Sequence, residues 1–391
     1  MIAVKDRLRA NDLDQLFSAL KSSGYSLLGP RVHNGAIIYS NIDSSHDLPR
    51  GWTDEQEAGT YRLKKTESAA YFGFASSPQS WKQFLFPSRE RLVRAEKKPG
   101  GRITFVSEEP DTQKRAFIGV RACDIVAISI QDRIFIDSQI QDPSYKARRE
   151  NSLLVAVECT SSGATCFCAS MKTGPGVRGG YDLVLTEVVH ERDHYFIIRA
   201  GSESGETLLE QLSQTGVLLE SGPEDQAHAQ AVVKTAASSQ KRKMDAPGAR
   251  DLLARSFDHK RWDEVATRCL NCANCTLVCP TCFCANVEDH SDLTGDHAER
   301  WRRWDSCFTL DHSYIHGGSV RMSAQSRYRQ WLTHKVSTWW DQFGTTGCVG
   351  CGRCITWCPV GIDIVEEVRA IGKDENDRGT TQGASLFRGV A

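Results

Sequence analysis

Two copies of one cysteine spacing constrain this chain more than any other feature of its sequence. The first copy runs from Cys269 to Pro280 and the second from Cys348 to Pro359, and both read C-x₂-C-x₂-C-x₃-C-P. Three closely spaced cysteines can wrap one face of an iron–sulfur cubane, and in two-cluster ferredoxins the fourth cysteine binds the other cluster. The repeat therefore predicts a pair of [4Fe–4S] clusters with exchanged fourth ligands.

This exchange gives each predicted cluster three cysteines from one copy and one from the other. The first cluster is assigned to Cys269, Cys272, Cys275 and Cys358. The second cluster is assigned to Cys348, Cys351, Cys354 and Cys279. The proline after each fourth cysteine cannot continue a helix and ends the ligand loop. Structural zinc is the alternative, but zinc favours two separated C-x₂-C pairs over intact runs of four.

Four further cysteines lie in the first half of the chain. Cys123 and Cys159 follow the strand-like runs 116–120 and 153–157, and the loop Thr165-Cys-Phe-Cys168 comes shortly afterwards. Cysteines at the ends of two strands can converge with a C-x-C loop on one site. We therefore predict a third [4Fe–4S] cluster, with the ligands Cys123, Cys159, Cys166 and Cys168. Buried free thiols are the alternative, because free cysteine is among the most buried residue types.

Three cysteines, Cys282, Cys284 and Cys307, remain without an assignment. They could hold a further cluster with a non-cysteine ligand such as Asp305 or His290. Packing beneath the two assigned clusters is the simpler interpretation, and the trio is left out of the predicted sites.

Composition excludes several other classes of protein. The 391 residues include 48 Lys plus Arg against 49 Asp plus Glu, and this balance argues against a nucleic-acid-binding surface. An odd total of 15 cysteines, with no apolar signal-like segment near the N-terminus, does not fit an extracellular disulfide scaffold. No stretch approaches the roughly 20 apolar residues of a membrane span. We expect a cytoplasmic protein with reduced, metal-binding thiols.

The cysteine distribution and the apolar periodicity predict an α+β chain. Residues 1–240 show mixed α/β signals, beginning with a helix at 12–21 and a hairpin around His33-Asn34-Gly35. Further strands are expected at 116–120, 153–157, 183–189 and 195–198, and helices at 206–220 and 225–240. A linker is expected at 241–248.

The second predicted domain, residues 249–373, reads as a mostly α-helical dicluster ferredoxin-like domain. A helix is expected over 249–268, and the region 298–340 shows no convincing strand. The polar, Gly-rich tail 374–391 is predicted to be mobile.

No motif indicates a catalytic site in this chain. Residues 174–179 match G-x-G-x-x-G, but they follow a cysteine loop and precede a strand, so we interpret them as a turn-rich loop. No phosphate-binding loop, nucleophile elbow or H-E-x-x-H pair occurs, and the 11 histidines show no metal or triad spacing. Arg268 and Arg353 adjoin predicted ligands and could offset cluster charge, although surface positions are the simpler interpretation.

Four segments together resemble a known family. They are FASSPQSWKQFLFPSRE (74–90), GVRACD (119–124), TCFCASM (165–171) and CPTCFC (279–284). They are similar to the β subunit of cytoplasmic NADP-linked nickel–iron hydrogenases, or sulfhydrogenases. The A subunit of anaerobic sulfite reductases is a close relative of that subunit. The resemblance runs from about residue 72 to 370.

The resemblance implies an electron-transfer subunit of an oxidoreductase complex. It would relay electrons through [4Fe–4S] clusters between a flavin subunit that handles NAD(P)H and the hydrogenase small subunit, and through this to the nickel–iron large subunit. The corresponding electron-transfer subunit of an anaerobic sulfite reductase is one alternative, and a zinc-stabilised binding module without redox activity is another. The chain shows neither the nickel-site pattern nor a flavin or nicotinamide motif, and the N-terminal part is expected to dock subunits and hold the third cluster.

Overall fold

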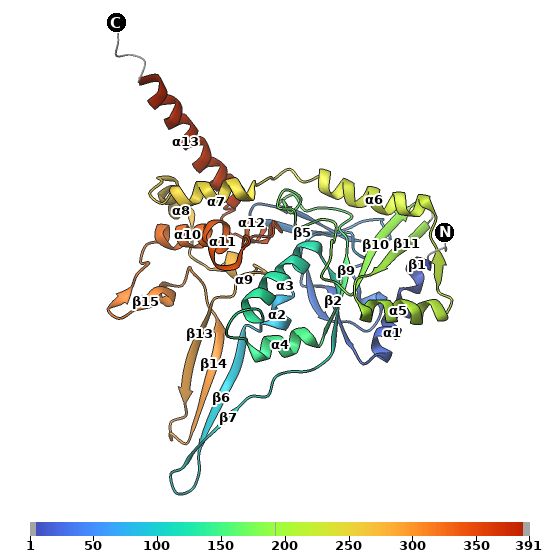
Figure 1. The fold of residues 1–391 in the computed structure, drawn as a ribbon, viewed down its shortest axis with the longest axis horizontal. Coiled ribbons are helices and arrows are strands. Elements are labelled where there is room, and N and C mark those ends of the chain that lie inside the picture. The colour runs from blue at the N-terminus through green and yellow to red at the C-terminus, as the bar shows by residue number, and fades with distance from the viewer. Residues whose placement is uncertain (1–4, 192, 386–391) are drawn as a thin grey trace.

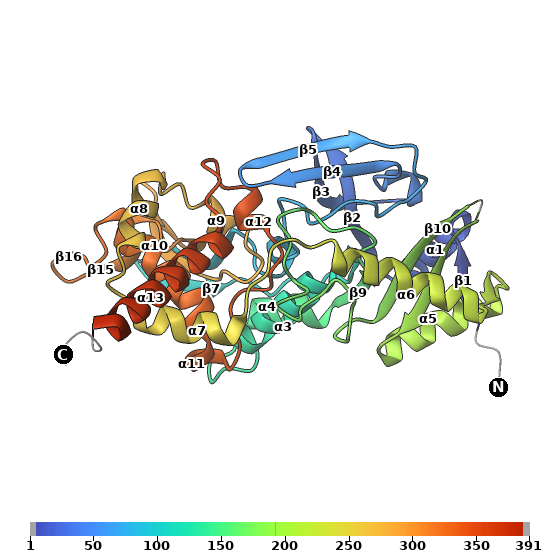
Figure 2. The same cartoon turned by 90° about the horizontal axis from the view of Figure 1, so that it is seen from above.

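The computed structural model describes residues 5–191 and 193–385. The molecule is elongated, with a large β-sheet at one end and the C-terminal helices at the other (Figure 2). Within the described residues, no helix combines the length and apolar character needed to cross a membrane.

A mixed eight-stranded sheet forms the core of the N-terminal part. Its strand order is β12-β1-β11-β10-β9-β8-β2-β3. The neighbours β8 and β9 are parallel, with Phe117 paired with Leu154, and both are apolar and almost fully buried. Such continuous apolar runs are typical of strands covered on both faces. The strands are β1 (Lys5–Arg9), β2 (Ser26–His33), β3 (Ala36–Asn41), β8 (Arg115–Val120), β9 (Ser152–Val157), β10 (Leu183–His190), β11 (Asp193–Ala200) and β12 (Leu218–Glu220).

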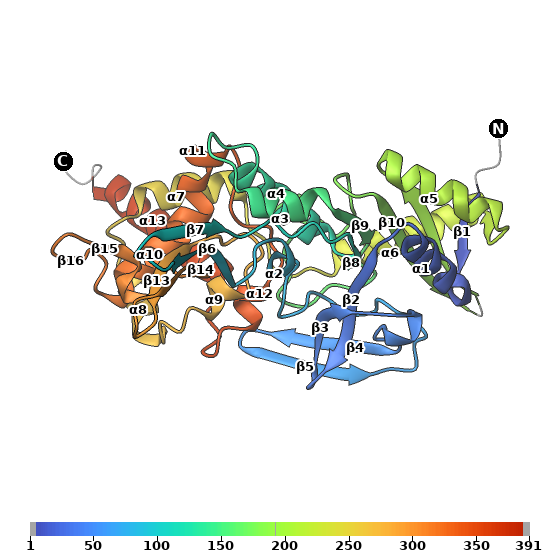
Figure 3. The same cartoon turned by 90° about the horizontal axis from the view of Figure 1, so that it is seen from below.

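Helices cover both faces of this sheet (Figure 3). Successive side chains of a strand point to opposite faces. In β9, Leu153, Val155 and Val157 pack in the core that contains residues of α1 and α5. Leu154 and Ala156 pack in the core that contains residues of α3 and α4. The helices of this part are α1 (Leu13–Ser22), α2 (Lys82–Leu85), α3 (Ala122–Phe135), α4 (Pro143–Glu150), α5 (Glu203–Gln214) and α6 (Pro223–Ser238).

Most elements predicted for the N-terminal part are present. The helix at 12–21 is α1, the first hairpin is β2–β3, and the four further strands are β8 to β11. Residues 174–179 form a loop, as predicted. The predicted helix 206–220 is too long, because α5 ends at Gln214 and β12 follows. Gly216 between them has a φ of 76°, a left-handed conformation that favours the end of a helix.

A second sheet joins segments from both halves of the sequence. Strands β6 (Arg89–Lys97) and β7 (Ile103–Ser107) pair with β13 (Ala285–Ser291) and β14 (His297–Trp304) in the order β13-β14-β6-β7. These strands project from the body of the molecule (Figure 1). The prediction that 298–340 contains no strand is therefore wrong. The β13–β14 hairpin is mostly polar or charged and lacks apolar alternation, and its partner β6 lies far earlier in the sequence.

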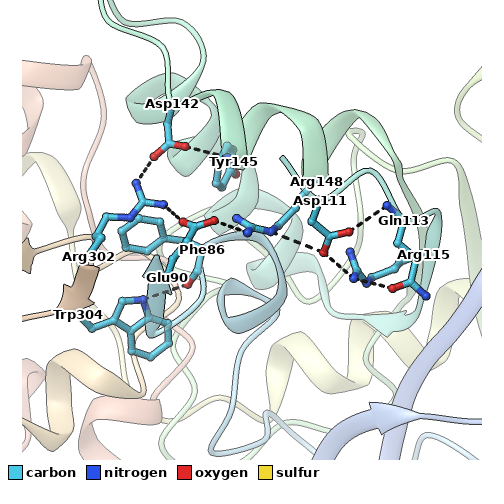
Figure 4. A network of polar contacts seen from close by, with 10 residues as sticks. All are labelled: Phe86, Glu90, Asp111, Gln113, Arg115, Asp142, Tyr145, Arg148, Arg302 and Trp304. Atoms are coloured by element: carbon cyan, nitrogen blue, oxygen red, sulfur yellow. Dashed lines mark hydrogen bonds and ion pairs between the residues drawn. The ribbon is translucent and has the colours of Figure 1, made fainter. Parts of the chain in front are cut away.

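Ion pairs of low exposure fix the second sheet to the N-terminal part (Figure 4). Arg302 of β14 contacts Glu90 of β6 and Asp142 at the start of α4. Arg148 of α4 contacts the same Glu90. The side chains of these four residues are at most 14% exposed, so each charge depends on its partners for compensation. The network holds β6, β14 and α4 together across the two halves of the chain.

The C-terminal part packs its helices around an aromatic core that includes Trp262, Tyr328 and Trp331. Two short hairpin strands, β15 (Tyr314–Ile315) and β16 (Gly318–Ser319), and a further hairpin, β4 (Trp52–Glu57) with β5 (Thr60–Lys65), complete the fold. The helical elements are α7 (Ala246–Arg255), α8 (Arg261–Arg268), α9 (Asn274–Leu277), η3 (Leu310–Ser313), α10 (Ala324–Thr333), the π-helical turn η4 (His334–Thr338), α11 (Trp339–Phe343), α12 (Arg353–Thr356) and α13 (Ile364–Ser385).

The predicted helix over 249–268 is two helices, α7 and α8, with a turn between them. The indole N–H of Trp262 donates to the backbone oxygen of Ser256 at 2.8 Å. The backbone N–H of Arg261 donates to Nδ1 of His259 at 3.0 Å. These contacts satisfy polar groups at the break between α7 and α8. The apolar periodicity of the segment does not indicate this break.

The fold class is α+β, as predicted, although the C-terminal part carries the β13–β14 hairpin in addition to its helices. The division into 1–240 and 249–373 remains a proposal, with the addition that both parts contribute strands to the second sheet. Helix α13 continues into the predicted tail as far as Ser385. The last part of that tail, 386–391, lies outside the described residues.

Candidate iron–sulfur centres

The two ligand loops share one backbone shape. In the first loop, Asn271 and Ala273 have φ values of 53° and 64°, and at the equivalent positions of the second loop Gly350 and Gly352 have 65° and 75°. A left-handed conformation costs a residue with a Cβ roughly 1–2 kcal/mol. Asn271 and Ala273 therefore adopt this conformation with strain, whereas glycine adopts it in the second loop without strain. Backbone strain of this kind is typical of functional sites.

Each loop leads into a one-turn helix, α9 or α12. Asn274 at the start of α9 donates from Nδ2 to the backbone oxygen of Trp357, just after α12, at 2.7 Å. This contact holds the ends of the two motifs side by side. Cys279 and Cys358, the fourth cysteines, lie just beyond these helices.

The first predicted quartet lies around an apolar hollow. Burial raises the pKa of the Cys275 thiol, and the charges of Cys269, Cys358 and Cys272 raise it further. Four thiols on one apolar hollow need positive charge before they can all ionise, and cluster iron would supply it. The donor set therefore fits a [4Fe–4S] cluster. The hollow is lined by these four cysteines, by Cys354, and by side chains that include Phe308, Tyr328, Trp331, Ile362 and Ile364.

The second predicted quartet is more deeply buried. Burial raises the pKa of the Cys354 thiol, and the charges of Cys348, Cys351 and Cys279 raise it further. The structure thus places the fourth cysteine of the first motif beside the first three of the second. This grouping supports the exchange of fourth ligands, and ligation by each quartet stays a prediction.

The third predicted quartet lies where β8 and β9 end. Because these strands are parallel neighbours, their carboxyl ends meet at one edge of the sheet. Cys123 lies in the first turn of α3 and Cys159 follows β9. Burial raises the pKa of Cys166, and the charges of Cys168 and Cys159 raise it further. Cys123 in turn interacts with Cys168. The four cysteines are brought together, and their binding of a cluster stays a prediction.

The loop of the third quartet lies directly on the second motif. The backbone N–H of Phe167 donates to the oxygen of Gly350 at 2.9 Å. A Cβ at Gly350 would lie 2.8 Å from the backbone of Cys168, and a Cβ at Gly352 would lie 2.5 Å from the backbone oxygen of Thr165. Glycine at both positions therefore permits this close approach.

A buried ion pair links the second motif to α3. Arg353 donates two hydrogen bonds of 2.8 Å to the carboxylate of Asp124, and both side chains are at most 1% exposed. The interpretation of Arg353 as a surface residue is therefore wrong. The local sequence gives no sign that the second motif packs against α3, and this packing buries Arg353. Arg268 is 42% exposed and pairs with Glu367 at 2.6 Å.

Lys335, on the π-helical turn η4, is a buried cation beside the second quartet. Its Nζ lies 3.4 Å from Sγ of Cys279 and 3.2 Å from Oγ1 of Thr281. Burial opposes the charge, but the charges of Cys279 and Cys282 outweigh it and raise the pKa of Lys335 above its usual value. Hydrogen bonding with Cys282 and the charge of Lys335 lower the pKa of Cys279. Lys335 has no signal in the sequence, because no motif surrounds it.

Lys335→Met is expected to lower the reduction potential of the cluster predicted at the second quartet. Unit charges about 5 Å apart at an effective dielectric constant near 20 interact by roughly 3 kcal/mol, or roughly 130 mV for one electron. The reduction potential falls because the Lys335 cation stabilises the reduced cluster, which is the more negative state, and the methionine does not. A redox titration followed by electron paramagnetic resonance (EPR) measures it. Lys260→Met, at an exposed lysine, is the control, and equal potentials in the two variants would contradict the assignment.

Other hydrogen bonds also reach predicted ligand sulfurs. Gln240 donates from Nε2 to Sγ of Cys168 at 3.2 Å, and the backbone N–H of Ile362 donates to Sγ of Cys358 at 3.3 Å. Donors to ligand sulfur are one of the means by which proteins set cluster potentials.

The three unassigned cysteines lie in two places. Cys282 shares a hydrogen bond with Cys279 beside the second quartet. Cys284 and Cys307 lie together, with their sulfur atoms 4.0 Å apart. His290, a candidate ligand on sequence grounds, is 54% exposed on β13 and pairs with Glu288.

Comparison with known proteins agrees with this geometry. Residues 268–362, which contain both cysteine motifs, match the family model of a 4Fe-4S dicluster domain. The chain is 29% identical over 367 residues to the protein named sulfhydrogenase 2 subunit beta from Pyrococcus furiosus, and the match covers 93% of this chain and 98% of that relative. The resemblance found in the sequence is confirmed: the chain is an iron–sulfur protein with a 4Fe–4S dicluster domain, related along nearly its whole length to a sulfhydrogenase β subunit.

Proposed function

We propose that this chain is the electron-transfer subunit of a multisubunit nickel–iron hydrogenase. In this role it relays electrons between an NAD(P)H-linked flavin subunit and the hydrogenase small subunit. The observation that carries the proposal is the continuous arrangement of three cysteine quartets. The name of the relative from Pyrococcus furiosus supports the hydrogenase assignment.

The second quartet lies between the other two. Cys354 of the second quartet interacts with Cys275 of the first. Cys351 of the second quartet interacts with Cys123 and Cys166 of the third. A [4Fe–4S] cluster on each quartet would supply a one-electron redox centre at each of three neighbouring positions. The order first, second, third is therefore the proposed electron path.

The middle of this path is shielded from solvent by the chain's own residues, whereas one end of the path is exposed to solvent. The second quartet is enclosed by the first motif, the loop of Phe167 and the buried cation Lys335. Cys272 of the first quartet is exposed, and the neighbouring Leu270 is 62% exposed. One partner is proposed to exchange electrons at this exposed end.

The two predicted domains have different proposed roles. Residues 249–373 hold the first and second clusters, with Cys279 and Cys358 exchanged between their motifs. Residues 1–240 supply all four cysteines of the third quartet and dock the neighbouring subunit at that end of the path.

Purification of the tagged chain from its own host tests the proposed complex. A flavin subunit and a nickel-containing large subunit are expected to co-purify, identified by mass spectrometry and metal analysis. Co-purification of a sirohaem subunit would contradict the hydrogenase assignment and support the sulfite reductase alternative.

Cys166→Ser is expected to remove about four irons from the chain, because serine is a poor ligand for the cluster predicted at the third quartet. Iron and acid-labile sulfide analysis of the anaerobically purified full chain measures the loss. Thr165→Ser, in the same loop, is the control and keeps all the iron. An unchanged iron content in Cys166→Ser would make the third quartet a group of packed thiols.

A further inference from the structure

Three metal-type ligands meet at the base of the β13–β14 hairpin, outside the three quartets. Cys284 precedes β13, Cys307 follows β14, and His312 lies in η3. The two sulfur atoms are 4.0 Å apart, and one ligand atom from each of the three residues lies within 4.8 Å of the others. Within the part of the chain that the structure describes, no other set of three or more His, Cys, Asp or Glu side chains is as compact.

Asp305 holds the ring of His312 in place. Its Oδ2 lies 2.6 Å from Nδ1 of His312, and its backbone N–H donates to the oxygen of Cys284 at 2.8 Å. Metal-bound histidines commonly donate their second ring N–H to a carboxylate, which fixes the tautomer and the orientation of the ring. With Nδ1 occupied by Asp305, Nε2 is the nitrogen left for a metal.

We propose that Cys284, Cys307 and His312 bind one mononuclear zinc ion, separate from the iron–sulfur clusters, and that Asp305 is a positioning residue for His312. Zinc–sulfur bonds of about 2.3 Å in a tetrahedron place two sulfur ligands about 3.8 Å apart. The observed 4.0 Å matches this spacing. Cysteines of a cubane bind different irons and therefore stand farther apart than two ligands of one ion.

Charge and access at the site also suit a zinc ion. Two thiolates and a neutral imidazole balance the charge of Zn²⁺. All three ligands are partly buried, and the surface beside His312 is a hollow lined by Asn286, Asp311 and Tyr314. Three protein ligands leave a fourth position for water. The ion would link the base of the β13–β14 hairpin to η3. It would thereby stabilise the segment between the two cysteine motifs.

Metal analysis of the full chain tests this site. The wild-type chain is expected to hold one zinc together with its cluster iron. Cys307→Ser and His312→Ala are each expected to lose the zinc and to keep their iron and acid-labile sulfide. His290→Ala, at the exposed histidine of β13, is the matched control and keeps the zinc. Asp305→Asn is expected to weaken zinc binding about 10-fold or more in competition with a chelator.

X-ray absorption at the zinc edge of the wild-type chain tests the same site without any substitution. The expected spectrum has two sulfur ligands near 2.3 Å and nitrogen or oxygen ligands near 2.0–2.1 Å. A zinc-free wild-type chain, or zinc without sulfur ligands, would overturn the proposal. So would the loss of about four irons in Cys307→Ser, which would indicate a further cluster.

Discussion

Cys358→Ser is expected to damage the first predicted cluster, although Cys358 belongs to the second motif. Cys358 lies beside Cys275 and Cys269 at the apolar hollow. A serine oxygen is a poorer iron ligand than a thiolate, so the first cluster should lose its EPR signal and up to about four irons. The signal of the second cluster should persist. EPR of the reduced protein, with iron analysis of the same sample, measures both results.

The reciprocal variant is the matched control. Cys279→Ser is expected to damage the second cluster, because Cys279 lies beside Cys354 and is held by Lys335. The two variants should therefore lose different signals, each from the motif that does not contain the substitution. If each variant instead loses only the cluster of its own motif, the exchange of ligands is wrong.

Asp124→Ala is expected to destabilise the protein by about 3–5 kcal/mol, because it leaves the buried Arg353 guanidinium without its carboxylate. Both hydrogen bonds of 2.8 Å are lost, and Arg353 is 0% exposed. For a chain of this length the midpoint of thermal unfolding should fall by roughly 5 °C. Differential scanning calorimetry under anaerobic conditions measures the fall.

An exposed ion pair of the same geometry provides the control. Arg300 and Asp289 make two hydrogen bonds of 2.7 Å, with side chains 54% and 63% exposed. Asp289→Ala should leave the midpoint nearly unchanged, because water replaces the lost partner. Similar midpoints for Asp124→Ala and Asp289→Ala would show that the Asp124–Arg353 pair does not join α3 to the second motif.

Local patterns in the sequence predicted much of the site. The repeated spacing predicted two matching loops, and the shared left-handed positions at Asn271 and Gly350 show that the backbone repeats as well. The third quartet was predictable because Cys123 and Cys159 follow strand-like runs, and adjacent parallel strands end at one edge of a sheet.

Contacts between distant segments were not predictable in this way. The β13–β14 hairpin is polar rather than apolar, and its pairing with β6 depends on a segment far earlier in the chain. Lys335 and Arg353 are buried by segments remote in sequence, while a single lysine or arginine normally indicates a surface position. His312 has no metal-type spacing to Cys284 or Cys307 and meets them only through the fold.

The central claim is that the cysteine quartets hold iron–sulfur clusters and form a redox path. Iron, zinc and acid-labile sulfide in the full chain, purified without oxygen, test it most directly. Three quartets predict about 12 irons and about 12 sulfides per chain, with EPR signals that appear on reduction. A chain that holds zinc alone, without acid-labile sulfide, would contradict the account.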